Sequence, residues 1–433
     1  MSDPYTPQSG DPSFDVESYD LDLAYKVRVN RLEGRAVINA VAALPLRSFA
    51  LDLVGLRATR VRVDGDRRTT FRQGAHGLRV TPPAPLAAGE AFSVEVVYAG
   101  APVPRRTRWG TIGWEELENG ALVASQPIGA PTWFPCNDRP DDRAQFRIRI
   151  RTDAPYTPIA TGVRLSAGRA GGMSTAVYES HVPTATYLVA VHVGDYRETP
   201  LDGPVPIALA HPAPLAVAAR TAFADVPRML EVFGDAFGPY PQESCTIVVT
   251  PDDLEIPLEA QGLAVFGANH LDAASHRLVA HELAHQWFGN SVGLARWRDI
   301  WLNEGFACYA EWIWSEASGG PSADALAREH YELVRAEPQD LLLTDPGPDD
   351  MFDDRVYKRG ALALHALRMT LGDDAFFDLV RDWTTRHRHA LVTTDDFRAL
   401  VAAAGHAELL AEWIDRMPLP ALPPLRMPRG TQR

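Results

Sequence analysis

The sequence lacks the features of a secreted, membrane-spanning or nucleic-acid-binding protein. Its three cysteines, Cys136, Cys245 and Cys308, are too few and too scattered for a disulfide framework or a cysteine zinc site. The N-terminus has neither a basic start nor an apolar run, and no stretch of about 18 uninterrupted apolar residues occurs. We therefore expect a cytoplasmic location, and any bound metal must be held by histidines and carboxylates.

Positive charge is also scarce, because the formal net charge is -14 and Lys26 and Lys358 are the only lysines. This balance argues against nucleic acid or an anionic membrane as a partner, since both attract basic surfaces. The 433 residues exceed one ordinary core, and 46% of them are apolar. No Gly, Ser or Gln tract suggests disorder, so we expect a chain folded almost throughout into two or three domains.

The hydrophobic pattern changes near residue 200. From Tyr19 to about Ile150, short runs alternate apolar and polar residues between Gly and Pro breaks, which is typical of an antiparallel sheet. After RETPLDGPVP, which reads as a linker, apolar residues recur mostly at helical spacing. The sequence thus predicts a multidomain α+β protein, with an N-terminal antiparallel β-sheet domain over 1–200 and a mainly helical domain over 201–433.

The strongest motif is HELAHQWFGN, residues 281–290, inside a helical pattern. Residues four apart lie on one face of a helix, so His281 and His285 can present imidazole nitrogens to one ion. Glu282 then falls beside the ion, where its carboxylate can accept a proton from the attacking water. A bare H-E-x-x-H can also arise by chance on an ordinary helix, so the motif needs a third ligand to support a metal site.

WLNEGFACYAEW, residues 301–312, supplies that third ligand, Glu304, in a second helical pattern. A catalytic zinc usually takes three protein ligands and keeps one position for water. The eighteen residues between His285 and Glu304 let the first helix end near Gly289, and Asp299 is expected to cap the second helix. The predicted ligands of one Zn²⁺ are therefore His281, His285 and Glu304.

The two motifs together resemble the gluzincin aminopeptidases, the group that contains aminopeptidase N and the leukotriene-epoxide hydrolase. QPIGAPTWFPCNDRPDDRAQF, residues 126–146, is similar to the family segment Q-x-x-x-A-R-x-x-F-P-C-x-D-E-P, although Pro131 and Arg139 replace its Arg and Glu. The resemblance covers most of the chain. It implies a saddle-like sheet domain followed by a thermolysin-like catalytic domain.

The resemblance also implies roles for residues outside the zinc motif. Gln126 matches the family glutamine that helps to hold the free α-amino group of the substrate. Tyr357, in VYKRGALALHALR, matches the tyrosine of Y-x-K-G-A, whose hydroxyl stabilises the oxyanion, and Arg359 stands where that Lys would be.

Glu259 matches the amine-binding glutamate of the family segment G-x-M-E-N. In this chain the segment reads IPLEA, so only the glutamate is kept. The replacements for Gly, Met and Asn are Ile256, Leu258 and Ala260. We expect the altered segment to change the preference for the first residue of the substrate.

The function implied by the resemblance is that of a zinc metallo-aminopeptidase, which hydrolyses the N-terminal bond of peptides with a free N-terminus. Alternatives are an endopeptidase or an epoxide hydrolase on the same zinc, or a non-catalytic binding scaffold. Family members usually carry a large C-terminal helical domain over the cleft, whereas only residues 358–433 follow Tyr357 here. A short form with a more open active site is therefore expected. The sequence does not indicate the oligomeric state.

Overall fold

The computed structural model describes residues 2–423, which form two compact units. The first unit comprises the described residues up to Phe223 together with Gln242–Asp272, and the second comprises Ala224–Pro241 and the described residues from Ala273 onward. The first unit is built mostly of strands and the second mostly of helices, as the α+β prediction requires. The units do not follow chain order throughout, and the domain boundary near residue 200 stays a prediction.

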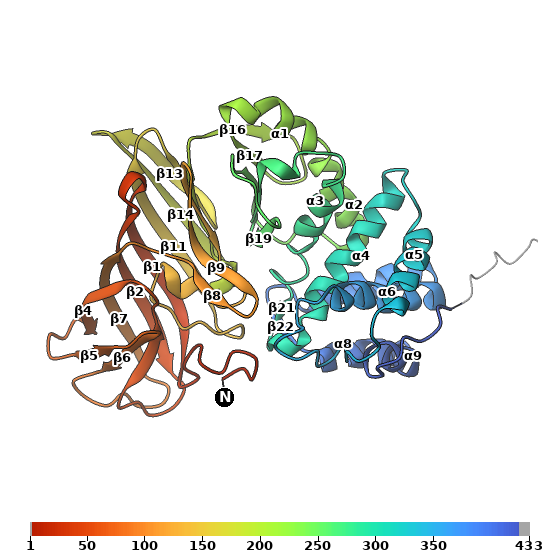
Figure 1. The fold of residues 1–433 in the computed structure, drawn as a ribbon. Coiled ribbons are helices and arrows are strands. Elements are labelled where there is room, and N and C mark those ends of the chain that lie inside the picture. The colour runs from red at the N-terminus through yellow and green to blue at the C-terminus, as the bar shows by residue number, and fades with distance from the viewer. Residues whose placement is uncertain (1, 424–433) are drawn as a thin grey trace, which may run out of the picture. The chain divides into compact units, whose positions relative to one another are not determined.

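A seven-stranded sheet dominates the first unit, in the order β13-β14-β11-β1-β2-β7-β4 (Figure 1). Its strands alternate buried and exposed residues, so that one face covers a core of aromatic and branched side chains. The pairing is not antiparallel throughout, because β1 and β11 pair in parallel register. A hydrophobic pattern predicts which face of each strand is buried. It does not predict whether a partner strand more than a hundred residues further along the chain runs parallel or antiparallel. The strands are β1 (Phe14–Lys26), β2 (Arg31–Ala42), β4 (Arg57–Val63), β7 (Ala91–Gly100), β11 (Arg143–Asp153), β13 (Val163–Ala170) and β14 (Met173–Ala185).

Two smaller sheets complete the N-terminal part of this unit, a five-stranded one in the order β12-β15-β10-β9-β8 and a three-stranded one in the order β3-β6-β5. Their strands are β3 (Phe49–Asp52), β5 (Thr70–Gln73), β6 (Gly77–Thr81), β8 (Arg105–Thr107), β9 (Gly110–Leu117), β10 (Gly120–Ala124), β12 (Thr157–Ala160) and β15 (Val191–Gly194). Gln126 lies two residues after the end of β10, so this sheet determines its place.

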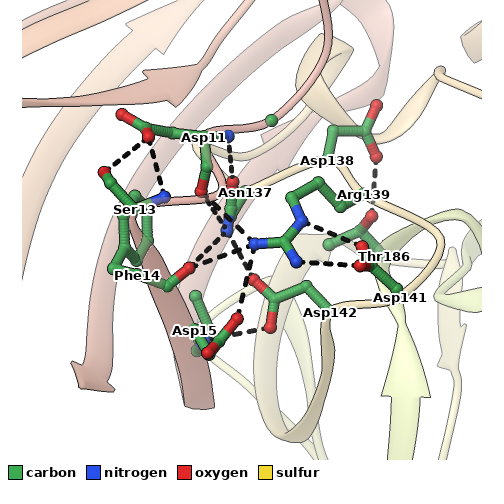
Figure 2. Close-up of polar contacts among 12 residues, drawn as sticks. Asp11, Ser13, Phe14, Asp15, Asn137, Asp138, Arg139, Asp141, Asp142 and Thr186 are labelled. Atoms are coloured by element: carbon green, nitrogen blue, oxygen red, sulfur yellow. Dashed lines mark hydrogen bonds and ion pairs between the residues drawn. The ribbon is translucent and has the colours of Figure 1, made fainter. Parts of the chain in front are cut away.

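A buried polar cluster joins the segment before β1 to residues 137–142 (Figure 2). Arg139 is only 9% exposed, and its guanidinium makes a two-point ion pair with Asp141, with both N–O distances 2.9 Å. It also donates to the main-chain oxygens of Phe14 (3.3 Å) and Asp11 (3.4 Å). The glutamate of the family motif could not donate these bonds, so Arg139 provides a contact that a carboxylate cannot.

A further sheet of the first unit corrects the interpretation of RETPLDGPVP as a linker. Its first half, residues 197–201, lies in β16 (Tyr196–Leu201), which pairs antiparallel with β17 (Ile207–Pro212). The order β16-β17-β18-β20-β19 makes β16 an edge strand, where Pro200 is tolerated because one side of the strand needs no partner. The remaining strands are β18 (Cys245–Val249), β19 (Leu258–Ala260) and β20 (Leu263–Phe266), and Glu259 lies on β19.

Helices carry the predicted metal ligands in the second unit. Residues 214–237, whose apolar side chains recur at helical spacing, form two helices, α1 (Ala216–Ala222) and α2 (Val226–Phe237). Helix α1 belongs to the first unit. Pro227 lies in the first turn of α2, where its missing N–H costs no helical hydrogen bond. The others are α3 (His276–Ala284), α4 (Trp301–Ala317), α5 (Ala323–Ala336), α6 (Asp354–Leu371), α7 (Asp373–Arg386), α8 (Thr394–Ala403) and α9 (Ala407–Ile414), with a short pairing of β21 (Gly293–Leu294) and β22 (Leu391–Val392). Within residues 2–423, no helix is both long and apolar enough to cross a membrane.

Helix α4 lies at the centre of the second unit. Every residue from Trp301 to Trp314 is buried, so the helix is covered on all sides. Two of these residues are glutamates, Glu304 and Glu311. Because an isolated buried carboxylate is costly, each needs a positive or hydrogen-bonding partner, and these partners form the candidate site.

Candidate metal centre

Three side chains from α3 and α4 converge on one point. The Nε2 atoms of His281 and His285 lie 3.5 and 3.4 Å from the same carboxylate oxygen of Glu304, Oε2. The three candidate ligand atoms are all within 4.8 Å of one another, and all three residues are buried. Two imidazoles and one carboxylate facing a common point are the donor set of a catalytic zinc, so these residues fit the ion that the sequence predicts.

The end of α3 explains how His285 is oriented. The helix ends at Ala284, earlier than the predicted Gly289, but His285 keeps helical angles (φ -56°, ψ -23°) and so stays one turn from His281. The chain then turns through Gly289, whose φ of +111° disfavours any residue with a side chain. This turn places the main-chain oxygen of Phe288 3.1 Å from His285 Nδ1. Because a carbonyl only accepts, Nδ1 carries the hydrogen and Nε2 is left to bind a metal.

Glu311 orients the other histidine and was not predicted from the sequence. Its Oε1 lies 2.8 Å from His281 Nδ1, and its Oε2 accepts from Arg277 at 3.0 Å. A carboxylate on the outer nitrogen fixes the ring and increases its strength as a metal ligand. Glu311 follows Glu304 by seven residues, which is two helical turns on the same face. That spacing within WLNEGFACYAEW is the signal that could have found it.

The electrostatics of the site favour a cation. Burial raises the pKa of Glu304, but the two imidazoles outweigh burial and hold the pKa well below its ordinary value. For His281, burial lowers the pKa, whereas hydrogen bonds to Glu304 and Glu311 raise it to about 9. Burial raises the pKa of Glu311, but its hydrogen bond and charge interaction with His281 outweigh burial and lower the pKa to about 2. One ionised carboxylate, Glu304, therefore faces the buried point, and a second, Glu311, lies behind His281, which suits a divalent ion.

Glu282 and Tyr357 lie close to these ligands. Glu282 is 5% exposed and adjoins His281 on α3. Tyr357 is in the first turns of α6, and its ring stacks on that of His281, with centroids 6.0 Å apart and planes at 20°. The second unit thus brings together five of the seven residues predicted for the site. Gln126 and Glu259 belong to the first unit, and their role at the substrate amine stays a prediction.

Asp299 does not cap α4 as predicted. The residue before the helix is Ile300, and no side chain caps that end. Asp299 lies one residue too early, in a short 3₁₀ turn, where it pairs with Arg296 (2.9 Å) and accepts from the main-chain nitrogen of Thr394 (3.1 Å). It therefore joins the start of α4 to the start of α8.

Arg359, which stands at the position of the family lysine, binds main-chain oxygens. It donates to Trp413 (2.8 Å), to Met417 (2.6 Å) and to Arg416. These carbonyls lie at the end of α9, where such groups have no helical partner. Arg359 therefore links α6 to the end of α9 through several N–H donors of one planar guanidinium, which a lysine does not have.

Comparison with known proteins agrees with this zinc metallopeptidase geometry. The chain matches the peptidase M1 N-terminal domain over residues 16–188 and the peptidase family M1 domain over residues 221–416. An M1 zinc metallopeptidase from Deinococcus radiodurans superposes with a TM-score of 0.90 at 32% sequence identity, covering 98% of this chain and 100% of that one. The chain belongs to peptidase family M1.

Curated relatives are longer than this chain. Endoplasmic reticulum aminopeptidase 1 of Homo sapiens is 30% identical over 72% of this chain and 36% of its own length. Aminopeptidase M1 of Arabidopsis thaliana is 27% identical over 71% of this chain and 38% of its own length. The chain thus spans less than two fifths of these relatives. Membership of a family of zinc metallopeptidases implies one catalytic zinc ion, in agreement with the predicted cofactor.

Proposed function

We propose that this chain is an aminopeptidase that removes the N-terminal residue of peptides. The observation that carries the proposal is the convergence of His281, His285 and Glu304 within 4.8 Å, in a chain that belongs to family M1. These residues would hold the zinc. When bound, zinc polarises the attacking water and the scissile carbonyl, which lowers the pKa of the water towards roughly 7.

Glu282 is the proposed general base. A carboxylate oxygen of Glu282 lies within 4.8 Å of a ring nitrogen of the proposed ligand His285, which supports a position beside the attacking water. It accepts a proton from this water and later delivers the proton to the leaving amine. Tyr357 donates its phenolic hydrogen to the developing oxyanion, and its stacking on His281 supports a position at the reacting carbonyl.

Gln126 and Glu259 are the proposed ligands of the α-ammonium group of the substrate. The side-chain nitrogen of Gln126 is buried and makes no hydrogen bond to any residue that the structure describes, so its amide has capacity left for a ligand. The carboxylate of Glu259 is half-buried on β19 and complements a cation. Anchoring the amine in this way would present only the first peptide bond for cleavage. A structure of a mutant of the Deinococcus radiodurans M1 zinc metallopeptidase bound to a Tyr-Ser-Ala substrate supports short peptides as substrates. Structures of mutants of a two-domain M1 zinc metallopeptidase bound to L-arginine and to L-tryptophan support binding of a single amino acid.

The test is hydrolysis of a panel of aminoacyl reporter substrates, free and N-acetylated, with and without a metal chelator. We expect turnover of free substrates only, its loss on chelation and its recovery with Zn²⁺. Equal cleavage of acetylated and free substrates would exclude an aminopeptidase and favour an endopeptidase. Absence of turnover with zinc bound to the protein would favour a binding scaffold or an epoxide hydrolase.

The cytoplasm is the proposed location. All three cysteines lie in the described part of the chain, and none forms a disulfide, which suits a reducing compartment. Fractionation of the source cells tests this, and recovery of the protein in a secreted fraction would contradict it.

A further inference from the structure

The main chains of helices α4 and α6 approach each other closely at two glycines. A Cβ atom built on Gly305 would lie 2.8 Å from the Cα of Gly360, and one built on Gly360 would lie 2.7 Å from the Cα of Gly305. Real Cβ atoms essentially never come so close, and both obstacles are main-chain atoms. A side-chain rotation therefore cannot relieve the overlap, and any larger residue must move one helix away from the other.

Neither glycine is needed for its backbone conformation. Both lie inside α-helices, and neither has the positive φ that would require glycine. In a helix interior glycine is about 1 kcal/mol less favourable than alanine. The benefit that offsets this cost is the close approach itself, since nothing else at these positions requires a missing side chain.

The two glycines adjoin residues with proposed roles at the zinc. Gly305 directly follows Glu304, and Gly360 comes three residues after Tyr357, on a neighbouring part of the same helix face. We infer that Gly305 and Gly360 are positioning residues, which set the distance between the zinc site on α4 and the oxyanion-binding hydroxyl on α6. This inference rests on the proposed role of Tyr357.

The metal ligands and Tyr357 respond differently to this crossing. All three ligands lie on α3 and α4 or at their ends, so moving α6 does not alter the ligand set. Tyr357 moves with α6. Its ring stacks on that of His281, and the distance between these rings depends on how closely α6 approaches α4. A displacement of about 1 Å can reduce catalysis about 100-fold, because an oxyanion donor must meet the charge as it develops.

Other contacts between α4 and α6 hold the pair together without setting this distance. They are long side chains with adjustable torsions: Lys358 donates to Cys308 (3.4 Å), Arg368 pairs with Glu316 (2.9 Å), and Tyr309 lies 3.1 Å from His365. Such contacts tolerate a shift of the helices that the glycine crossing does not. They are expected to keep the unit folded when a methyl group enters the crossing.

The test is Gly360→Ala in the whole chain, loaded with zinc. We expect a fall of kcat of about 10- to 100-fold, with zinc content and KM little changed. Gly234→Ala is the matched control, because Gly234 also lies in a helix of this unit but its Cβ would meet nothing within 4 Å. The control is expected to keep the parental kcat.

A double variant separates positioning from general damage. With Tyr357→Phe already present, Gly360→Ala should lower kcat no further, because the group that it displaces is gone. If the two losses multiply, or if Gly360→Ala alone keeps full kcat, the inference is wrong. If Tyr357→Phe itself keeps full kcat, the proposed role of Tyr357 fails first. Gly305→Ala repeats the test from α4, and failure of both alanine variants to fold would assign the crossing to folding and overturn the inference.

Discussion

Buried carboxylates occur in both units, but their surroundings act on them in opposite ways. In the second unit, Glu304 and Glu311 have histidine partners, and the pKa of each is held well below its ordinary value. In the first unit, burial outweighs the hydrogen bonds and cations around three aspartates. The pKa is raised to about 6 for Asp52, about 8 for Asp138 and about 7 for Asp142.

The comparison shows that burial of acids does not by itself mark a metal site. An ionised buried carboxylate needs compensating positive charge, which a metal with its histidines supplies. Near neutral pH, Asp138 with a pKa of about 8 is mostly neutral and Asp142 with a pKa of about 7 is partly neutral, and both act as hydrogen-bonding groups. Asp142, for example, accepts from the main-chain nitrogen of Val16 (3.0 Å) and from Asn137 (2.5 Å), which fastens the start of β1.

The largest effect is expected for Glu282→Gln, in the unit that carries the proposed metal ligands. The amide keeps the size of the side chain but cannot accept a proton, so kcat should fall about 100- to 10,000-fold. Zinc content should stay unchanged, because Glu282 is not among the proposed ligands. Steady-state kinetics with metal analysis checks both points, and substantial remaining turnover would remove Glu282 from the role of base.

A smaller effect is expected for Glu311→Gln. Loss of the charge that holds His281 should weaken zinc binding about 10- to 100-fold. Asp142→Asn is the matched control, since it makes the same change to a buried carboxyl of the first unit. Competition with a chelator of known affinity measures both variants. Equal zinc affinity in Glu311→Gln and the parent would contradict the proposed orienting role.

The smallest effect, counted per pH unit, concerns the pH dependence of stability and uses Asp138. Its folded pKa of about 8 exceeds the unfolded value near 4, so between these values the folded state binds an extra proton. Stability should therefore fall as the pH rises through this window, by about 1.4 kcal/mol per pH unit for one proton. Asp138→Asn imitates the protonated form and should make the dependence shallower.

Denaturant unfolding at several pH values checks this prediction. The variant should be more stable than the parent at pH 8 and nearly equal to it at pH 4, where the parent carboxyl is already protonated in the folded state. An unchanged slope in Asp138→Asn would mean that this carboxyl is ionised in the folded protein, and the contrast between the two units would not hold.

Local spacing in the sequence determined much of the second unit. Four residues separate His281 from His285, so one helical turn places both side chains on the same face. Glu304 could be predicted as the next ligand because a catalytic zinc usually takes three protein ligands. The helices around them were also predictable, because their apolar residues recur with the helical period. The alternating pattern of the first unit predicted strands for the same reason.

Only the tertiary structure decided contacts between segments far apart in sequence. The parallel pairing of β1 with β11, the edge strand that includes Pro200 and the Arg139 cluster all depend on partners that no local pattern specifies. The same holds for Gly305 and Gly360. In the sequence they are unfavourable residues in two helix interiors, and only the tertiary structure shows that the two helices contact each other at these positions. Sequence periodicity determines which face of a helix or strand a side chain lies on. The residues that it contacts are determined by tertiary packing, because the close approach of two segments depends on every residue between them.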